Sequence, residues 1–217
     1  MTLPTLRIEQ SFWKKGILLA AGVDEVGRGA FAGPVVAGAV IITNPNEFVR
    51  IKRKHELSRI RDSKIVSEKE REELYARLIA SGIDWSVGII PVTRIDAIGI
   101  GRANREAIVR AVMTLRTTPD HVLVDAIRVR ALRIPHTPVV DGDSRVFSIA
   151  AASIIAKVTR DRMMRQLHEQ YPQYGFATHK GYGTRAHTTA LALHGPCPVH
   201  RHSFGPIHAL YDKAQEG

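Results

Sequence analysis

Short apolar runs in a particular order most restrict the fold of this 217-residue chain. Two runs, at 17–23 and 35–42, come first and flank a glycine-rich turn, which predicts two buried strands paired as a hairpin. Three shorter extended segments, at 85–89, 121–125 and 138–140, follow between stretches with helical spacing. Strands first, then strands interleaved with helices, predict an α/β fold with a mixed sheet flanked by helices.

Helix signals separate these strands. Ser67 and Glu70 match a capping box, and alanines recur at helical spacing after residue 103. A later alanine-rich segment suits a long helix that approaches its neighbours closely, and a glycine ends a short helix in the tail. We therefore expect helices at 68–80, 103–115, 148–171 and 185–194.

The chain divides into three parts on composition. Residues 1–16 are polar and mixed, which indicates a loose N-terminal leader. Residues 17–172 carry the strands and long helices of a main α/β domain. Residues 173–217 are rich in Gly, His and Pro and predict a small helical C-terminal extension.

The charge is strongly basic, with 31 Lys+Arg against 21 Asp+Glu and a formal net charge of +10. Such an excess favours a polyanionic partner, most often nucleic acid, although a solvated cationic surface is an equally good reading of charge alone. Cys197 is the single cysteine, so it forms no internal disulfide, and we expect it to be inert. The apolar runs are too short to cross a bilayer and no secretory signal is evident, so we expect a cytoplasmic protein without a membrane partner.

Carboxylates follow three of the predicted strands. Asp24 and Glu25 come directly after the first apolar run, Asp125 ends the strand at 121–125, and Asp141 and Asp143 follow the last extended segment. Carboxylates at the end of a hydrophobic sheet are costly without a cation, and their oxygens suit Mg²⁺ or Mn²⁺. Two such ions can support phosphodiester hydrolysis. Any one of these residues could instead cap a helix or pair with an Arg, so the prediction depends on the whole set.

Other acidic and metal-binding side chains fit simpler explanations. Asp62, Asp161 and Glu169 lie in basic contexts, where surface salt bridges are expected. The histidines of the tail could suggest zinc, but no Cys accompanies them at ligand spacing, so we leave zinc out.

Five motifs in order resemble those of bacterial ribonuclease HII, and together they span nearly the whole chain. One such motif would be suggestive, whereas five in register are very unlikely by chance. The matching segments are Asp24-Glu25-Val26-Gly27-Arg28-Gly29 with Gly33-Pro34, Asp62-Ser63-Lys64, Ser148–Ser153 with Ala156–Asp161, His179–Thr184 and Ser203–Pro206.

The resemblance implies a ribonuclease H-like fold, in which 17–172 is the catalytic domain and 173–217 helps to hold the substrate. It also implies four metal-binding, catalytic carboxylates, which fall on Asp24, Glu25, Asp125 and Asp143. Asp141 remains an alternative to Asp143, since both would face the same side of an extended segment. The family's glycine-containing context after the third carboxylate reads Ala126-Ile127 here.

The implied reaction cuts the phosphodiester bond 5′ of a ribonucleotide, in an RNA/DNA hybrid or within duplex DNA, and leaves 3′-OH and 5′-phosphate ends. Two Mg²⁺ or Mn²⁺ ions would activate the attacking water. We expect a monomer that removes ribonucleotides from DNA.

The resemblance also assigns substrate contacts. Gly27, Arg28 and Gly29 would sense the ribose 2′-OH, although taken alone they are better explained by an ordinary hairpin turn with an exposed Arg. Tyr182 would pack on the sugar next to the cut, and it could also anchor the tail. Among Lys64, Lys157, Lys180 and Arg201, we favour Lys64 and Lys180 as phosphate contacts, because they belong to matched motifs.

Two alternatives remain. Ribonuclease HIII usually has Lys in the glycine turn and an extra N-terminal domain, whereas this chain has Arg28 and a short leader. A non-catalytic basic nucleic-acid-binding or ribosome-associated protein would have no reason to keep carboxylates at three strand ends.

Overall fold

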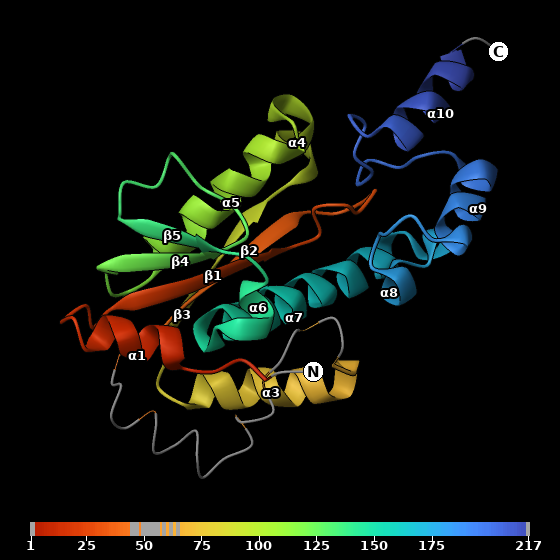
Figure 1. Ribbon diagram of the computed structural model, residues 1–217. Helices are drawn as coiled ribbons and strands as arrows, with labels where there is room; N and C mark the ends of the chain where they lie inside the picture. Colours follow the sequence, from red (N-terminus) through yellow and green to blue (C-terminus); the bar gives the residue numbers. More distant parts are fainter. Residues whose placement is uncertain are drawn as a thin grey trace.

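The computed structural model describes residues 3–43, 48, 57, 60, 63 and 66–215. Asp62 and Lys64 therefore lie outside the described residues. Figure 1 shows one twisted sheet with helices on both faces and the C-terminal helices to one side. The sheet has five strands in the order β3-β2-β1-β4-β5. This is the mixed sheet flanked by helices that the order of apolar runs predicts.

The first two strands pair antiparallel, β2 also pairs antiparallel with β3, and the other two neighbouring pairs are parallel. As a result β1, β3 and β4 all end at the same edge of the sheet. The strand bounds are β1 (Ala20–Val26), β2 (Val35–Ile41), β3 (Asp84–Ile90), β4 (His121–Asp125) and β5 (His136–Val139).

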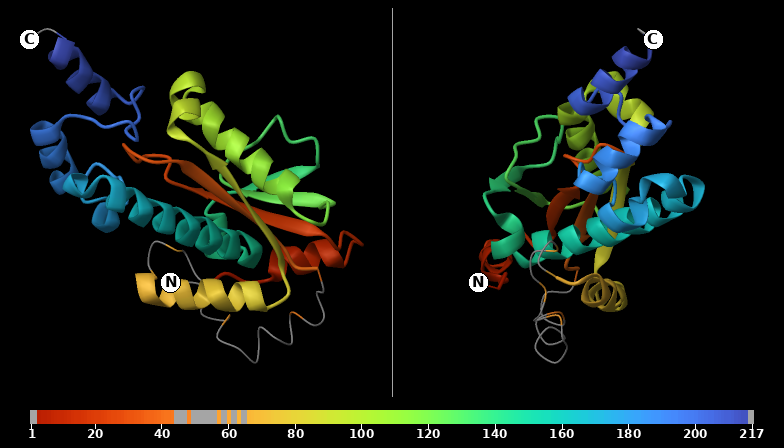
Figure 2. Two further views of the ribbon diagram at one scale, coloured as in Figure 1. Left: turned by 180° about the vertical axis from the view of Figure 1, so that it is seen from behind. Right: turned by 90° about the vertical axis from the view of Figure 1, so that its right-hand side faces the viewer.

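The helices form a layer on each face, as the two views of Figure 2 show. On one face lie α4 (Val92–Ile98) and α5 (Ile100–Thr114), and on the other lie α7 (Phe147–Gln170) and, outside it, α3 (Glu68–Ala80). The remaining helices are α1 (Arg7–Trp13), α6 (Gly142–Arg145), η2 (Pro172–Tyr174), α8 (Phe176–His179), α9 (Arg185–His194) and α10 (Gly205–Gln215).

Alternating side chains of β2 explain why both faces are covered. Ala37, Ala39 and Ile41 pack in the cluster under α5, while Val40 packs in the cluster under α7. The sheet approaches α7 very closely, because a Cβ added at Gly38 would lie 2.4 Å from the Ala152 backbone oxygen. The alanines of α7 and the glycines of the central strands therefore allow this contact.

The first strand is longer than its apolar run. The predicted strand stopped at Val23, but pairing with β2 continues to the Val26–Val36 pair. Asp24 and Glu25 thus lie inside the last part of β1 rather than after it. Ladder hydrogen bonds use the backbone, so they continue after the apolar side chains have ended.

Most other elements were predicted closely. The helices at 68–80 and 185–194 and the strand at 121–125 have the expected bounds, and the Ser67 side chain accepts a hydrogen bond from Glu70 N at 3.2 Å. The last strand lies at 136–139 instead of 138–140, and α4, α6 and α10 were not predicted. Pro138 lies inside β5, and a proline within a run of residues weakens the sequence signal for a strand, so the bounds of this edge strand were hard to predict.

The prediction of a loose leader was wrong for the described residues. Residues 7–13 form α1, and Glu9 is 1% exposed. Its Oε1 accepts a hydrogen bond from Ser148 N at 2.8 Å, in the first turn of α7. A carboxylate there satisfies a free backbone N–H and complements the helix dipole, so tertiary contacts order a polar segment.

The C-terminal helices have a small core of their own, which includes Tyr174, Phe176 and Leu191. That core also contains Ala32 and Met164, so the extension is joined to the main domain by shared packing. Asp96 of α4 accepts hydrogen bonds from the backbone N–H groups of residues 202 and 203, each at 3.0 Å. The boundaries at 16 and 172 remain predictions. None of the described helices is long and apolar enough to span a membrane.

Candidate active site

Parallel pairing of β1 and β4 brings the first two carboxylate groups together. Val23 is in register with Val124, so Asp24 and Asp125 are the next residues on adjacent strands. The charge of Asp125 contributes to the raised pKa of Asp24, which places the two carboxylates within electrostatic reach. Backbone register alone thus joins residues that are a hundred positions apart.

Asp24 occupies an unfavourable position for a charge. It is 5% exposed, and burial, followed by the negative charges of Glu25 and Asp125, raises its pKa to about 8. Its Oδ1 accepts the Glu25 backbone N–H at 2.8 Å, and Ser153 of α7 donates a further hydrogen bond. No described basic side chain forms an ion pair with it. Glu25, the next residue of the strand, points to the opposite face.

Asp143 reaches this edge through a turn and a short helix. Gly142 N donates to Asp125 Oδ1 at 2.7 Å, and Asp143 follows it as a 7% exposed residue. Asp141 is exposed and has a left-handed backbone with φ of +53°. The expectation that Asp141 and Asp143 share one side of an extended segment was wrong, because the chain turns at 141 and enters α6.

The donor set fits a divalent cation by its chemistry. Four carboxylates supply only oxygen ligands, which Mg²⁺ and Mn²⁺ prefer. A cation would offset the burial and the carboxylate repulsion that together raise the pKa of Asp24. Within the described part of the chain, no three His, Cys, Asp or Glu side chains are already close enough to hold a metal ion. The carboxylates therefore share one sheet edge without forming a finished coordination cage.

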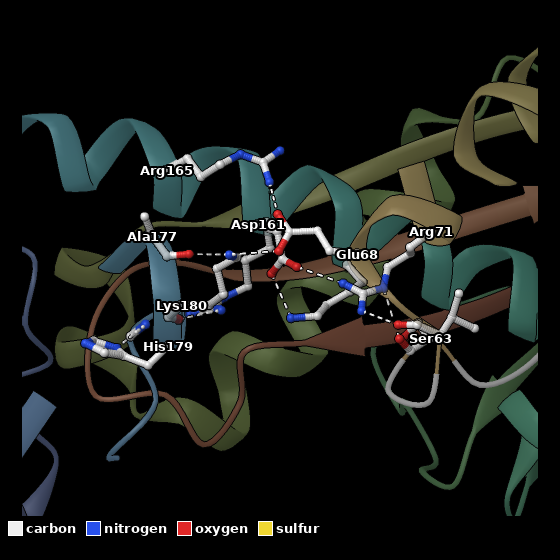
Figure 3. Close-up of polar contacts among 12 residues, drawn as sticks. Ser63, Glu68, Arg71, Asp161, Arg165, Ala177, His179 and Lys180 are labelled. Carbon is white, nitrogen blue, oxygen red and sulfur yellow. Dashed lines mark hydrogen bonds and ion pairs between the residues drawn. The ribbon is translucent and has the colours of Figure 1, made fainter. Parts of the chain in front are cut away.

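A second polar network stands behind Asp24. Ser153, which donates to Asp24, lies 2.9 Å from Ser63 by their hydroxyl oxygens, and Ser63 O accepts from Arg71 Nε at 3.0 Å. Arg71 also pairs with Asp161 at 3.0 Å. Ser63, the described member of the Asp62-Ser63-Lys64 motif, thus connects α3 and α7 to the carboxylate edge. Figure 3 shows the part of this network around Ser63, Arg71 and Asp161.

Asp161 and Lys157 belong to this buried network. Asp161 is 2% exposed and pairs with Arg71 at 3.0 Å and with Lys157 at 2.7 Å. Its expected salt bridge is therefore present, but it is buried rather than on the surface. Lys157, considered above as a phosphate contact, has its ammonium committed to Asp161.

The glycine turn is built around a buried arginine. Gly27 has φ of +86°, and a Cβ there would lie 2.1 Å from Arg160 Nε. Arg160 is fully buried and donates to three backbone carbonyls, those of Ala32, Pro34 and Lys180, at 3.1, 2.9 and 2.9 Å. Gly27 therefore makes room for a protein side chain, whereas nothing lies within 4 Å of a Cβ added at Gly29.

Arg201, a possible phosphate contact that we did not favour, supports the same turn and has its guanidinium engaged there. It is fully buried and donates to Gly33 O at 3.0 and 2.9 Å and to Arg28 O at 2.9 Å. Burial lowers the pKa of its guanidinium to about 9. The side chain of Arg28 itself is exposed.

The buried arginines are the main residues that sequence reasoning missed. Arg160 lies four and eight residues after Ala156 and Ala152, on the face of α7 that packs against β2. This spacing predicts that Arg160 is buried, and a buried Arg needs several acceptors. The periodicity of α7 was therefore the available signal.

Tyr182 and Lys180 lie next to Arg160. The Arg160 guanidinium carbon is 5.3 Å from the centre of the half-buried Tyr182 ring. Lys180 is 7% exposed, and its ammonium donates to Ala177 O and pairs with Glu68 at 3.4 Å, as Figure 3 shows. Two of the three N–H donors of this ammonium are therefore engaged within the protein, and a phosphate would compete with Glu68 for its positive charge.

Histidines fix the loop that carries Tyr182. His200 Nδ1 accepts from Cys197 N at 2.9 Å, and its Nε2 lies 3.0 Å from His187 Nε2. His187 Nδ1 lies 3.0 Å from Tyr182 O, so a neutral chain of donors and acceptors runs from Cys197 to Tyr182. Burial lowers the pKa of both histidines to about 4.

Comparison with known proteins agrees with this arrangement. The family model described as Ribonuclease HII matches residues 21–206. A ribonuclease HII of Dehalococcoides mccartyi is 44% identical over 204 residues, 94% of each chain.

Solved structures share the fold. The ribonuclease H2 of Pyrococcus horikoshii OT3 has a TM-score of 0.75 and 25% identity and covers 92% of this chain and 100% of its own. Bst-RNase HIII, solved in complex with Mn²⁺, has a TM-score of 0.71 at 19% identity. The match covers 93% of this chain and 71% of the Bst-RNase HIII chain, and at this identity it supports the fold alone. The chain belongs to the ribonuclease HII family and is a ribonuclease H-type endoribonuclease.

Proposed function

We propose that this enzyme hydrolyses the phosphodiester bond 5′ of a ribonucleotide, both in RNA/DNA hybrids and at single ribonucleotides within duplex DNA. The products are 3′-OH and 5′-phosphate ends. One observation carries the proposal: Asp24 and Asp125 are adjacent across the β1–β4 pair, and Asp143 follows the residue that donates to Asp125. Glu25 completes the proposed set of catalytic and metal-binding residues.

The proposed cofactors are two Mg²⁺ or Mn²⁺ ions, which when bound would supply Lewis-acid activation of water and neutralise the phosphate. Asp24, Glu25, Asp125 and Asp143 would hold them. Asp24 is buried against α7 with Ser153 and Glu25 N as hydrogen-bond donors, so its orientation is set before substrate binds. The Gly142–Asp125 hydrogen bond similarly orients the Asp125 side chain.

Recognition of the ribonucleotide is proposed for the Gly27-Arg28-Gly29 turn. Arg160 and Arg201 bind the carbonyls around this turn, and Gly29 faces open space, so its backbone is rigid and accessible. An accessible rigid backbone can hydrogen-bond a 2′-OH, the group that distinguishes RNA from DNA. Tyr182 would pack on the adjacent sugar, and Lys64 and Lys180 would contact phosphates.

The test uses duplex DNA with one embedded ribonucleotide, incubated with the purified protein in Mg²⁺ or in Mn²⁺. We expect a single nick 5′ of the ribonucleotide that disappears with chelator and with Asp24→Asn. Asp141→Asn, at an exposed neighbour of α6, is the matched control and should cut normally. Cleavage by Asp24→Asn, or cleavage of all-DNA duplex at the same rate, would refute the proposal.

The proposed setting is removal of ribonucleotides from DNA by a monomer in the cytoplasm. Monomeric mass by light scattering at working concentration checks the oligomeric state. Accumulation of alkali-sensitive sites in genomic DNA after loss of the gene would check the role, and unchanged alkali sensitivity would argue against it.

A further inference from the structure

A basic pocket that none of the four carboxylates lines lies between α5 and the segment that follows β4. Its volume is about 620 Å³. Four arginines line it together with Glu106, Val109 and Ala131, and they are Arg102, Arg105, Arg128 and Arg130. We call this set the arginine pocket.

Local structure directs all four arginines outward. Arg102 and Arg105 are one turn apart in the first part of α5, whose opposite face buries Ala103 and Ala107. On the other wall, Val129 is fully buried in the same apolar cluster. The residues on either side of Val129, Arg128 and Arg130, are exposed.

The positive charge of the pocket is not neutralised within the described residues. Glu106 is the one carboxylate in its lining, and it pairs with Arg94 at 3.1 Å and Arg110 at 2.7 Å, which lie outside the lining. None of the four guanidinium groups in the lining makes a hydrogen bond or ion pair with a described residue. Four like charges around one cavity repel one another, so the arrangement favours an anionic ligand.

The pocket begins beside the candidate active site. Arg128 and Arg130 follow Asp125 closely, and α5 starts just after β3 and α4, at the sheet edge where β1 and β4 also end. In both views of Figure 2 the C-terminal helices lie on the far side of this edge from the β4–β5 segment. The arginine pocket and the C-terminal extension therefore flank the carboxylates.

We propose that the arginine pocket binds the phosphate backbone of duplex nucleic acid next to the cleavage site, an inference that rests on the proposed function. Guanidinium groups bind phosphate oxygens through paired N–H donors. The lining has no aromatic side chain to stack on a base, so a free nucleotide fits less well than a backbone. The contacts would give affinity without sequence preference.

The experiment measures binding without cleavage. Fluorescence anisotropy follows a labelled all-DNA duplex, two helical turns long, in chelator and over a series of salt concentrations. For Arg128→Ala/Arg130→Ala we expect at least about a tenfold rise in Kd, and a slope of log K against log salt that is smaller by about two. Arg102→Ala/Arg105→Ala should behave in the same way.

A matched control removes the same charge elsewhere. Arg133 lies in the same segment but outside the pocket, and Arg7 lies on α1, so Arg7→Ala/Arg133→Ala is the comparison. Equal losses in the control and pocket variants would overturn the proposal, because general charge would then explain binding. Competition of wild-type binding by pyrophosphate alone, at concentrations where sulfate has no effect, would instead assign the pocket to a small phosphate ligand and also overturn it.

This design separates the two proposals. If pocket variants bind weakly while the wild type cuts no ribonucleotide, the arginine pocket stands and the proposed function fails. If the wild type cuts at the ribonucleotide and pocket variants bind normally, the proposed function stands and the arginine pocket fails.

Discussion

The carboxylate edge and the glycine turn lie at the same end of the sheet, but their polar groups are satisfied differently. At the carboxylate edge, Asp24 is buried beside other negative groups, and its pKa is raised to about 8. At the turn, Arg160 and Arg201 together donate six hydrogen bonds to five backbone carbonyls of the turn and its neighbours. Two of the six go to the Gly33 carbonyl. The first region keeps an unfavourable carboxylate that the proposed cations would neutralise, whereas the carbonyls of the second already have donors within the protein.

This difference suits the two proposed tasks, metal binding at the carboxylates and recognition of a 2′-OH at the turn. In a metal site, carboxylates can repel one another while the site is empty, because a cation that binds there removes the repulsion and stabilises the folded protein. A surface that reads a single hydroxyl group must be rigid beforehand, since loose groups would accept either sugar. Changes at the two regions should therefore have opposite effects on stability.

The largest expected effect is at the carboxylate edge. Asp24→Asn should lower cleavage by about a thousandfold or more, because it removes a ligand of the proposed metal site. In chelator the same variant should melt at a higher temperature than wild type, since an unfavourable buried charge is gone. Activity assays and thermal melts with and without Mn²⁺ measure both, and a lower melting temperature in chelator would contradict the comparison.

Removal of Arg160 should have the opposite effect on stability. Arg160→Met leaves three buried carbonyls without their donor, which should cost about 3 kcal/mol or more of unfolding free energy. Arg162→Met, two residues along and paired with Glu72 on the surface, should cost less than about 1 kcal/mol. Urea unfolding measures both, and equal losses would show that Arg160 contributes no more than a surface residue.

The histidine chain should make the turn side sensitive to acid. The pKa of His187 and His200 is about 4 when folded, below the ordinary 6.5, so the folded state binds fewer protons between these values. Stability from these groups is complete above about pH 6.5 and is lost as pH falls toward 4. The contribution of Asp24 to stability changes with pH in the opposite direction, because its folded pKa is raised and it loses stability as pH rises. Urea midpoints are therefore best compared in an Asp24→Asn background. There, His187→Gln should flatten the acid-side decline, and an unchanged decline would assign it to other groups.

The smallest expected effect concerns the residue after Asp125. Ala126 has φ of +51°, a left-handed conformation that is costly for a residue with a Cβ. Ala126→Gly should remove this strain but increase the freedom of the unfolded chain, so the net gain should be at most about 1 kcal/mol. Lys180, with the same φ, offers a comparison variant in Lys180→Gly, although its ion pair with Glu68 is lost as well. A clear loss of stability in Ala126→Gly would contradict the strain argument.

Much of the fold followed from local patterns. The capping box at Ser67, the apolar strand before Asp125 and the alanine spacing of α7 depend on nearby residues, and each predicted its element closely. The four carboxylates were also recognisable, because acidic residues next to apolar strands are unusual and the motifs around them occur in order. Their chemical role remains a prediction.

Tertiary structure decided what pairs each polar group. Nothing near Glu9 in the sequence indicates that it caps α7, and nothing near Arg201 indicates that it supports a turn some 170 residues earlier. Likewise, only the fold shows that Asp161 is buried with Arg71 and that Asp141 turns away while Asp143 turns in. Periodicity reports which face of an element is apolar, but the partner of a buried charge is chosen by long-range packing.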